Sequence, residues 1–179
     1  MIAGHARLSD TLIARYARFP DRKPAAPDDC RNRLLNCMEI TRPLPSPNPV
    51  EQTDAALLQT AEEVSDAVFR SVPVPPLMRE HFWVQSSVFA GCIFPAPVLQ
   101  ASHFTDVTFR NCDLSNADLS GCSFQRVEFV ECKLVGANLS EGTWQHVVFE
   151  RCKMEFANFT LGKFRGVRFA GGTMRSVGF

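Results

Sequence analysis

Seven cysteines and four histidines are the side chains of this sequence best suited to carry chemistry. Thiols and imidazoles are common ligands of zinc and common partners in nucleophilic catalysis. Four of the thiols lie 20 residues apart and a fifth, Cys122, lies midway between two of them. The four are Cys92, Cys112, Cys132 and Cys152. Such a regular interval indicates that the thiols lie in a repeating structural element.

No catalytic or metal-binding motif accompanies these residues. The histidines are scattered through the chain, at His5, His81, His103 and His146. There is no glycine-rich phosphate loop, no HExxH and no nucleophile elbow. Cys30 and Cys37 are separated by six residues without a nearby histidine pair, which is a poor metal signal. We therefore expect no enzyme, no cofactor and no metal site.

The thiols belong to a five-residue repeat. Large apolar residues occupy every fifth position of the C-terminal half without interruption. They are Phe89, Phe94, Leu99, Phe104, Phe109, Leu114, Leu119, Phe124, Phe129, Leu134, Leu139, Trp144, Phe149, Met154, Phe159, Phe164, Phe169, Met174 and Phe179. A period of five fits neither the helical 3.6 nor the strand 2.0, so it predicts a repeat architecture.

A column of small residues runs two positions ahead of the large ones, and both columns should face inward because strand side chains alternate. Cys112, Ala117, Cys122 and Val127 begin this column. Residue types recur in it every 20 positions, so four pentads make one turn of a four-sided coil. The thiols then serve as compact apolar side chains. Glycines at 142, 162 and 172 leave space for larger neighbours.

These pentads resemble the pentapeptide-repeat family, whose motif is Ala, then Asp or Asn, then Leu, followed by two free positions. Ala117-Asp118-Leu119, Ala137-Asn138-Leu139 and Ala157-Asn158-Phe159 are the best matches. The resemblance covers about half of the chain. It implies a right-handed, four-sided β-helix and says less about function, because the family has several unrelated roles.

Residues 1–82 differ in composition from residues 83–179, which we assign to the β-helix. Ten of the 12 prolines precede residue 77, and Pro43, Pro45, Pro47 and Pro49 alternate, which predicts an extended, solvated linker. Helical spacing of apolar residues predicts two amphipathic helices on either side of this linker. The first contains Leu8, Leu12, Ile13, Tyr16 and Phe19, and the second runs from about Asp54 to Arg70.

The two ends of a β-helix need cover, since each exposes a cross-section of the core and unpaired strand edges. We expect the second helix, or the Met78 to Val84 stretch, to cover the N-terminal end. At the other end Phe179 is an inward position with no shielding segment after it in this sequence. We expect this open coil either to form an end-to-end homodimer or to continue in a longer natural chain.

Function should then reside on the outer surface. Most outward positions are polar, but Val130, Val135, Val148, Phe156 and Leu161 are apolar. We take as the candidate interaction surface two of these apolar residues and three arginines of the last coils. They are Phe156, Leu161, Arg165, Arg168 and Arg175. The alternative is that the apolar residues contact the N-terminal arm. Glu131 and Arg151, one coil apart, should form an ion pair.

The charge balance narrows the function further. With 19 basic and 19 acidic residues, no strong field favours nucleic acid or an anionic membrane. No apolar run spans a membrane, no signal peptide is evident, and reduced thiols suit the cytoplasm. We expect a non-catalytic protein-binding or scaffold module with an unknown protein partner. One alternative is a DNA-mimicking topoisomerase-binding protein of the quinolone-resistance type, although residues 84–179 carry a net charge of only +1. A translocated bacterial effector is a further alternative.

Overall fold

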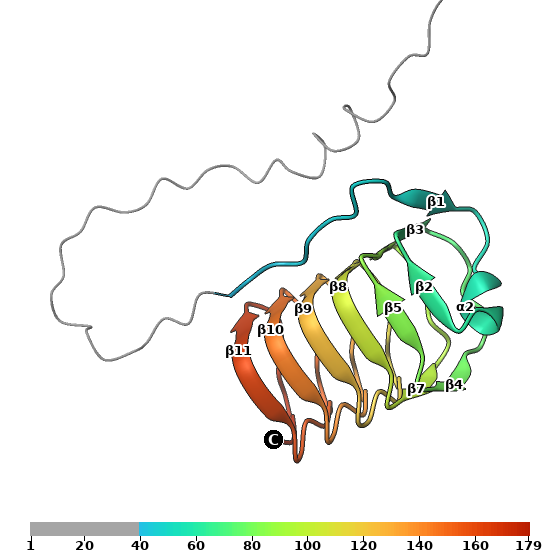
Figure 1. Cartoon of the computed structure of the whole chain (residues 1–179). Helices are drawn as coiled ribbons and strands as arrows, with labels where there is room; N and C mark the ends of the chain where they lie inside the picture. Colours follow the sequence, from blue (N-terminus) through green and yellow to red (C-terminus); the bar gives the residue numbers. More distant parts are fainter. Residues whose placement is uncertain (1–39) are drawn as a thin grey trace, which may run out of the picture. The chain divides into compact units, whose positions relative to one another are not determined.

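The computed structural model describes residues 40–179, which form a solenoid of stacked coils (Figure 1). Its elements in chain order are β1 (Val50–Gln52), α2 (Leu57–Thr60), β2 (Glu63–Ser65), β3 (Ala67–Arg70), β4 (Met78–Glu80), β5 (Trp83–Gln85), β6 (Val88–Ala90), β7 (Val98–Gln100), β8 (His103–Arg110), β9 (Ser123–Val130), β10 (Thr143–Glu150) and β11 (Lys163–Ala170). From β2 onward the strands pair in parallel with their counterparts 20 residues on, as at Phe104↔Phe124, and β1 pairs with β3 at an interval of 17 residues. The predicted four-sided, right-handed β-helix is confirmed.

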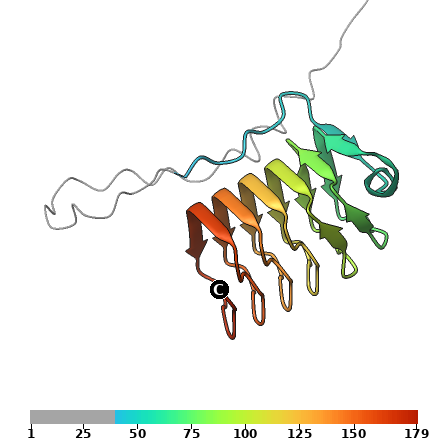
Figure 2. The same ribbon diagram turned by 60° about the horizontal axis from the view of Figure 1, so that its bottom comes forward.

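Four sides arise because each coil bends after every third extended residue. The first side holds β2, β5 and the first halves of β8 to β11, and the second side holds β3, β6 and the second halves. The other two sides are made mainly of single bridges, such as Asp113↔Lys133 and Asp118↔Asn138. Figure 2 shows the coils stacked in the same order from a second direction.

Aromatic rings stack along the axis to form much of the core. Six phenylalanines of the second side make one continuous stack, with neighbouring ring centroids 4.9 to 5.1 Å apart. They are Phe69, Phe89, Phe109, Phe129, Phe149 and Phe169. On the first side Trp144 stacks on Phe124 at 4.1 Å. Gly142 makes room for that indole, since a Cβ atom there would lie 2.7 Å from its Nε1.

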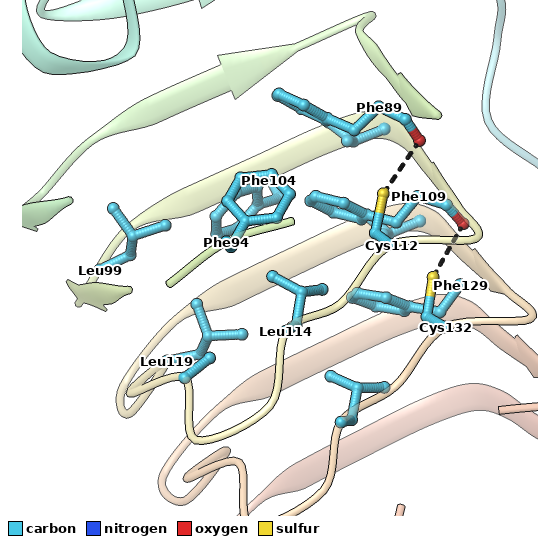
Figure 3. Close-up of a cluster of buried hydrophobic side chains, with 14 of the residues drawn as sticks. Phe89, Phe94, Leu99, Phe104, Phe109, Cys112, Leu114, Leu119, Phe129 and Cys132 are labelled. Carbon is cyan, nitrogen blue, oxygen red and sulfur yellow. Dashed lines mark hydrogen bonds between the residues drawn. The ribbon is translucent and has the colours of Figure 1, made fainter. Parts of the chain in front are cut away.

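The thiols of the repeat are buried in the core, as predicted. Each donates a hydrogen bond to a main-chain carbonyl of the preceding coil: Cys112 reaches Phe89 O at 3.4 Å and Cys132 reaches Phe109 O at 3.4 Å (Figure 3). Burial raises the pKa of the Cys122 thiol to about 12. The Cys122 thiol is therefore neutral, and all five thiols of the repeat pack as buried side chains of the core. Cys30 and Cys37 lie outside the described residues, as does the first predicted helix.

The second predicted helix, from about Asp54 to Arg70, is wrong except for one turn. Only Leu57–Thr60 is helical, and Glu63–Ser65 and Ala67–Arg70 are strands that pair with β5 and β6. Val64 and Phe69 lie five residues apart and continue the inward column, so the pentad pattern competes with the helical one there. Burial in the coil decides between the two patterns.

Arg79 explains why the pentad pattern is hard to see before Phe89. It occupies a large inward position of the column, and Leu77 and Phe82 are buried at small positions around it. Its guanidinium lies 4.4 Å from the Phe82 ring centroid and donates to the carbonyls of Leu58 and Ala61 at the end of α2. Because the large apolar residues here occupy the small positions, a search for an apolar residue at every fifth position misses the first coils.

The two ends of the described solenoid differ. At the N-terminal end α2 lies over the first coil (Figure 1), and its Leu58 side chain is 1% exposed within the core cluster. A helix covers this end as expected, but it is a single turn, and the Met78 to Val84 stretch instead forms β4 and part of β5. At the other end Phe164, Met174 and Phe179 are exposed.

Candidate functional site

Phe156 and Leu161 form an exposed apolar pair, which we call the corner patch. They lie at the two corners that bound the fourth side of the coil, with the bridge residue Asn158 between them. Their side chains are 68% and 78% exposed. The sequence placed them on neighbouring corners, and the structure shows both in solvent.

The backbone at both corners is left-handed, with φ of 59° at Phe156 and 60° at Leu161. Large side chains are rare in that region because Cβ crowds the following carbonyl, at a cost of roughly 1 kcal/mol or more. The same corners in the two preceding coils carry residues that suit the conformation better or are polar. They are Asn116 and Gly136 at one corner, and Gly121 and Glu141 at the other. The corners at Phe156 and Leu161 are therefore both strained and apolar.

The three arginines of the candidate surface do not gather around one point. The Arg175 carbonyl accepts the Phe156 N–H at 2.9 Å, so Arg175 adjoins the corner patch in the next coil. Arg165 and Arg168 lie in β11 opposite Gln145 and Val148, on the first and second sides. They extend the basic surface around the coil and away from the patch.

Charge is distributed unevenly along the axis. Residues 151–179 hold six basic side chains and one acidic one, a net charge of +5. Residues 40–150 hold six basic and thirteen acidic side chains, a net charge of −7. The corner patch thus lies in the basic part of an otherwise acidic rod. The balanced total for the whole chain conceals this separation.

A second feature, which the sequence did not predict, involves residues 40–49, here called the strap. The strap runs back along the coils toward β1 (Figures 1 and 2), and it is hydrogen-bonded to Asp106 in β8, Glu128 in β9 and His146 in β10. Proline alternation correctly predicted an extended segment, but the segment is bound to the solenoid. Asp106 and Glu128 are each only 7% exposed.

Outward apolar residues near the strap are also covered. Val130 and Val148 lie at outward positions of β9 and β10, yet they are buried. Both belong to the second side, where Arg42 of the strap reaches Glu128. The alternative of contact with the N-terminal arm therefore fits these two valines better than it fits Phe156 and Leu161.

Chemistry-bearing side chains do not converge in the described part of the chain. His103 stacks on Trp83, with centroids 4.1 Å apart, His146 contacts the strap, and His81 lies at another corner. Within residues 40–179 no cluster of three or more histidine, cysteine or acidic residues could hold a metal ion. The predicted Glu131–Arg151 ion pair is present, at 2.9 Å.

Stacked pentads, four sides and a core filled by its own side chains define this part of the molecule as a β-solenoid built from five-residue repeats. The family model for the pentapeptide repeat region matches residues 84–159 and 102–179, together more than half of the chain. The chain belongs to the pentapeptide-repeat family. No curated protein sequence matches it significantly.

Solved structures of pentapeptide-repeat proteins are similar over part of their length. A trypsin-treated form of QnrB1, a plasmid-mediated fluoroquinolone resistance protein, is 21% identical with a TM-score of 0.30, over 65% of this chain and 64% of that one. A pentapeptide repeat protein from the Arabidopsis thaliana thylakoid lumen is 24% identical with a TM-score of 0.35, over 61% of this chain and 70% of that one. Likeness of this size says nothing of partner or activity.

Among residues 40–179, no helix is long and apolar enough to cross a membrane.

Proposed function

We propose that this chain is a non-catalytic binding or scaffold module that presents the corner patch and the surrounding basic side chains to a protein partner. The observation that carries the proposal is the pair of large, exposed side chains at left-handed corners. Both side chains are exposed in the described fold, and Asn or Gly would suit the left-handed backbone of both corners better. Strain retained on an exposed surface favours a role in binding.

The charge around the patch indicates the kind of partner. Arg175 adjoins Phe156, and Lys163 lies two residues from Leu161 at the start of β11. A surface with an apolar centre and a basic surround fits a partner that offers an apolar pocket rimmed by carboxylates. Association should then weaken as ionic strength rises, because rim charges act mainly through long-range attraction.

The test introduces at both corners the residue types found two coils earlier, at Asn116 and Gly121, in the double variant Phe156→Asn and Leu161→Gly. Proteins captured from lysate of the source cells by the full chain are quantified for wild type and variant. We expect capture to be lost while the melting temperature stays equal or rises slightly. Met78→Ser, which removes an equally exposed apolar side chain at the opposite end, is the matched control and should capture normally.

Equal capture by the double variant and the wild type would contradict the proposal. A supercoiling assay with a type II topoisomerase addresses the alternative. A protein that mimics DNA needs a dense negative surface, because duplex DNA carries about one negative charge per 1.7 Å. The +5 charge of residues 151–179 works against such mimicry, so we expect no effect on supercoiling.

We also propose that the exposed last coil pairs with that of a second copy. Phe164, Met174 and Phe179 give this coil an apolar surface, which supports self-association. Two copies meeting there would bring two regions of +5 charge together, so salt should promote the dimer by screening the repulsion. Light scattering at low and high salt checks this. A monomeric mass at tens of micromolar under both conditions would refute it.

A further inference from the structure

The main chain of the strap donates hydrogen bonds at two equivalent corners of the solenoid. The Thr41 N–H donates to His146 Nδ1 at 3.3 Å, and the Leu44 N–H donates to Asp106 Oδ1 at 2.9 Å. His146 and Asp106 occupy the same corner two coils apart, with Arg126 at that corner in the coil between them. The step of three residues from Thr41 to Leu44 therefore spans two coils of the solenoid.

This register matches the geometry of a polyproline II helix. That conformation has three residues per turn and a rise of about 3.1 Å per residue, so residues i and i+3 present their N–H groups on one side about 9.3 Å apart. Parallel strands in neighbouring coils lie about 4.8 Å apart, so equivalent corners two coils apart are separated by about 9.6 Å. The two repeats agree to within a few tenths of an ångström.

The prolines of the strap fit the same arrangement. Pro43 and Pro45 lie on either side of the Leu44 donor and themselves have no N–H to satisfy. They also hold φ near the value that the polyproline II conformation requires. Pro43 and Pro45 therefore leave the Leu44 N–H between them to meet Asp106, and they reduce the entropy lost when the segment binds.

The corner column beneath the strap and the adjoining second side contain buried charge. Arg126 binds Asp106 through two hydrogen bonds of 2.7 Å, and Arg42 of the strap contacts Glu128 at 3.0 Å. The Glu128 side chain is 10% exposed, whereas that of Arg42 is 53% exposed. Carboxylates so close to complete burial require hydrogen-bond donors. The strap supplies donors to both carboxylates, so this face is adapted to hold a peptide.

We propose that Asp106, Glu128 and His146 form a binding site for proline-spaced polyproline II peptides, and that the strap is its intramolecular occupant. The site takes two N–H donors three residues apart, at corners two coils apart, and a basic side chain between them at Glu128. A segment of this kind from another molecule binds by displacing the strap. This site is separate from the corner patch and does not depend on the function proposed for it.

The strap competes from within the same chain, at an effective concentration in the millimolar range for a short tether. The wild-type chain should therefore bind an added peptide weakly. Weakening the strap alone should strengthen binding of the added peptide, because the site itself is unchanged. A direct test can thus use the full chain without truncation.

The probe is a fluorescent synthetic peptide with the sequence of residues 38–50, and its binding is followed by anisotropy. In the strap variant Arg42→Ala with Leu44→Pro, the ion pair and one N–H donor are lost while the extended conformation is retained. We expect this variant to bind the peptide at least about tenfold more tightly than wild type. Adding Glu128→Gln to the variant should remove that gain, and Glu131→Gln, on the exposed surface, should not.

Three outcomes would overturn the proposal: no gain in the strap variant, no effect of Glu128→Gln, or equal binding of a peptide with the same composition in which the prolines are no longer alternate. Thermal melts establish that each variant is folded. A second measurement uses only the wild-type chain, with a photoreactive group at the Leu44 position of the peptide. Cross-links should fall on β8 and its neighbours, and cross-links elsewhere would refute the site.

Discussion

The two ends of the described solenoid are built from the same repeat but have opposite properties. At the N-terminal end Leu58 of α2 is buried in the core, and Arg79 binds the last carbonyls of that helix turn. At the C-terminal end Phe179 is 65% exposed and the nearby corners carry large apolar residues. A repeat that specifies the interior leaves its ends to individual residues, so one end can be covered while the other exposes apolar side chains.

A substitution in the middle of the solenoid, away from both ends, should cause the largest loss of stability. Ala137 is fully buried and its neighbour Asn138 faces outward in the bridge column. Ala137→Arg forces a charge into a sealed core and should prevent folding, whereas Asn138→Arg should change stability by less than about 1 kcal/mol. Circular dichroism and thermal melts measure both, and similar losses would show that the inward and outward columns are misassigned.

The next largest loss of stability should come from a substitution at the N-terminal end, which can be compared with one at the C-terminal end. Leu58→Ala removes the buried side chain by which α2 covers the N-terminal end and should lower the free energy of unfolding by about 2 to 4 kcal/mol. Phe179→Ala removes a larger but mostly exposed side chain and should cost less than about 1 kcal/mol. Chemical denaturation of the two variants checks the difference. If Phe179→Ala proved the more damaging, the description of a sealed and an open end would be wrong.

Low pH should destabilise the coil that begins with β8 more than the C-terminal coils, although the difference should be smaller than those above. Burial opposes ionisation of Asp106, Asp113 and Asp118, but hydrogen bonds from Arg126, Ser115 and Gln100 hold the pKa of each carboxyl below its usual value. Their stabilisation is complete above about pH 4 and is lost as pH falls through the lowered values, at about 1 kcal/mol or less for each.

All three of these carboxyls lie in the coil that begins with β8, whereas residues 151–179 contain only Glu155. Hydrogen exchange can be measured as the pH is lowered from 5 to 2.5, with the protection of each strand expressed relative to its value at pH 5. We expect β8 and β9 to lose protection at a higher pH than β11. Uniform loss would count against regional control by charge. Asp106→Asn should reduce the acid sensitivity of β8 and leave β11 unchanged.

Much of the repeat could be predicted from the sequence because its determinants are local. The inward columns, the buried thiols and the Glu131–Arg151 pair all depend on a fixed interval of five or 20 residues. Prediction failed where that interval breaks. Arg79 at a large inward position obscured the first coils, and the apolar residues before it also fit helical spacing.

The contacts between the strap and its site could not be predicted from residue intervals, for a different reason. Arg42 and Glu128 are separated by 86 residues, and Thr41 and His146 by 105, with no shared period to connect them. Nothing in the sequence around Asp106 distinguishes it from the exposed acidic residues of other corners. The alternating prolines were visible, but their match to the spacing of the coils emerges only when the coils are in place.

The regular pairing of residues 20 positions apart has a consequence for the molecule under tension. Since parallel strands add one above another, a force that pulls the C-terminal strand away along the axis would break the hydrogen bonds of one coil before those of the next. Each detached coil would release about 20 residues, or about 65 Å of extended chain. The rod would lengthen in equal steps, and the bound strap would oppose the detachment of the coils that it crosses.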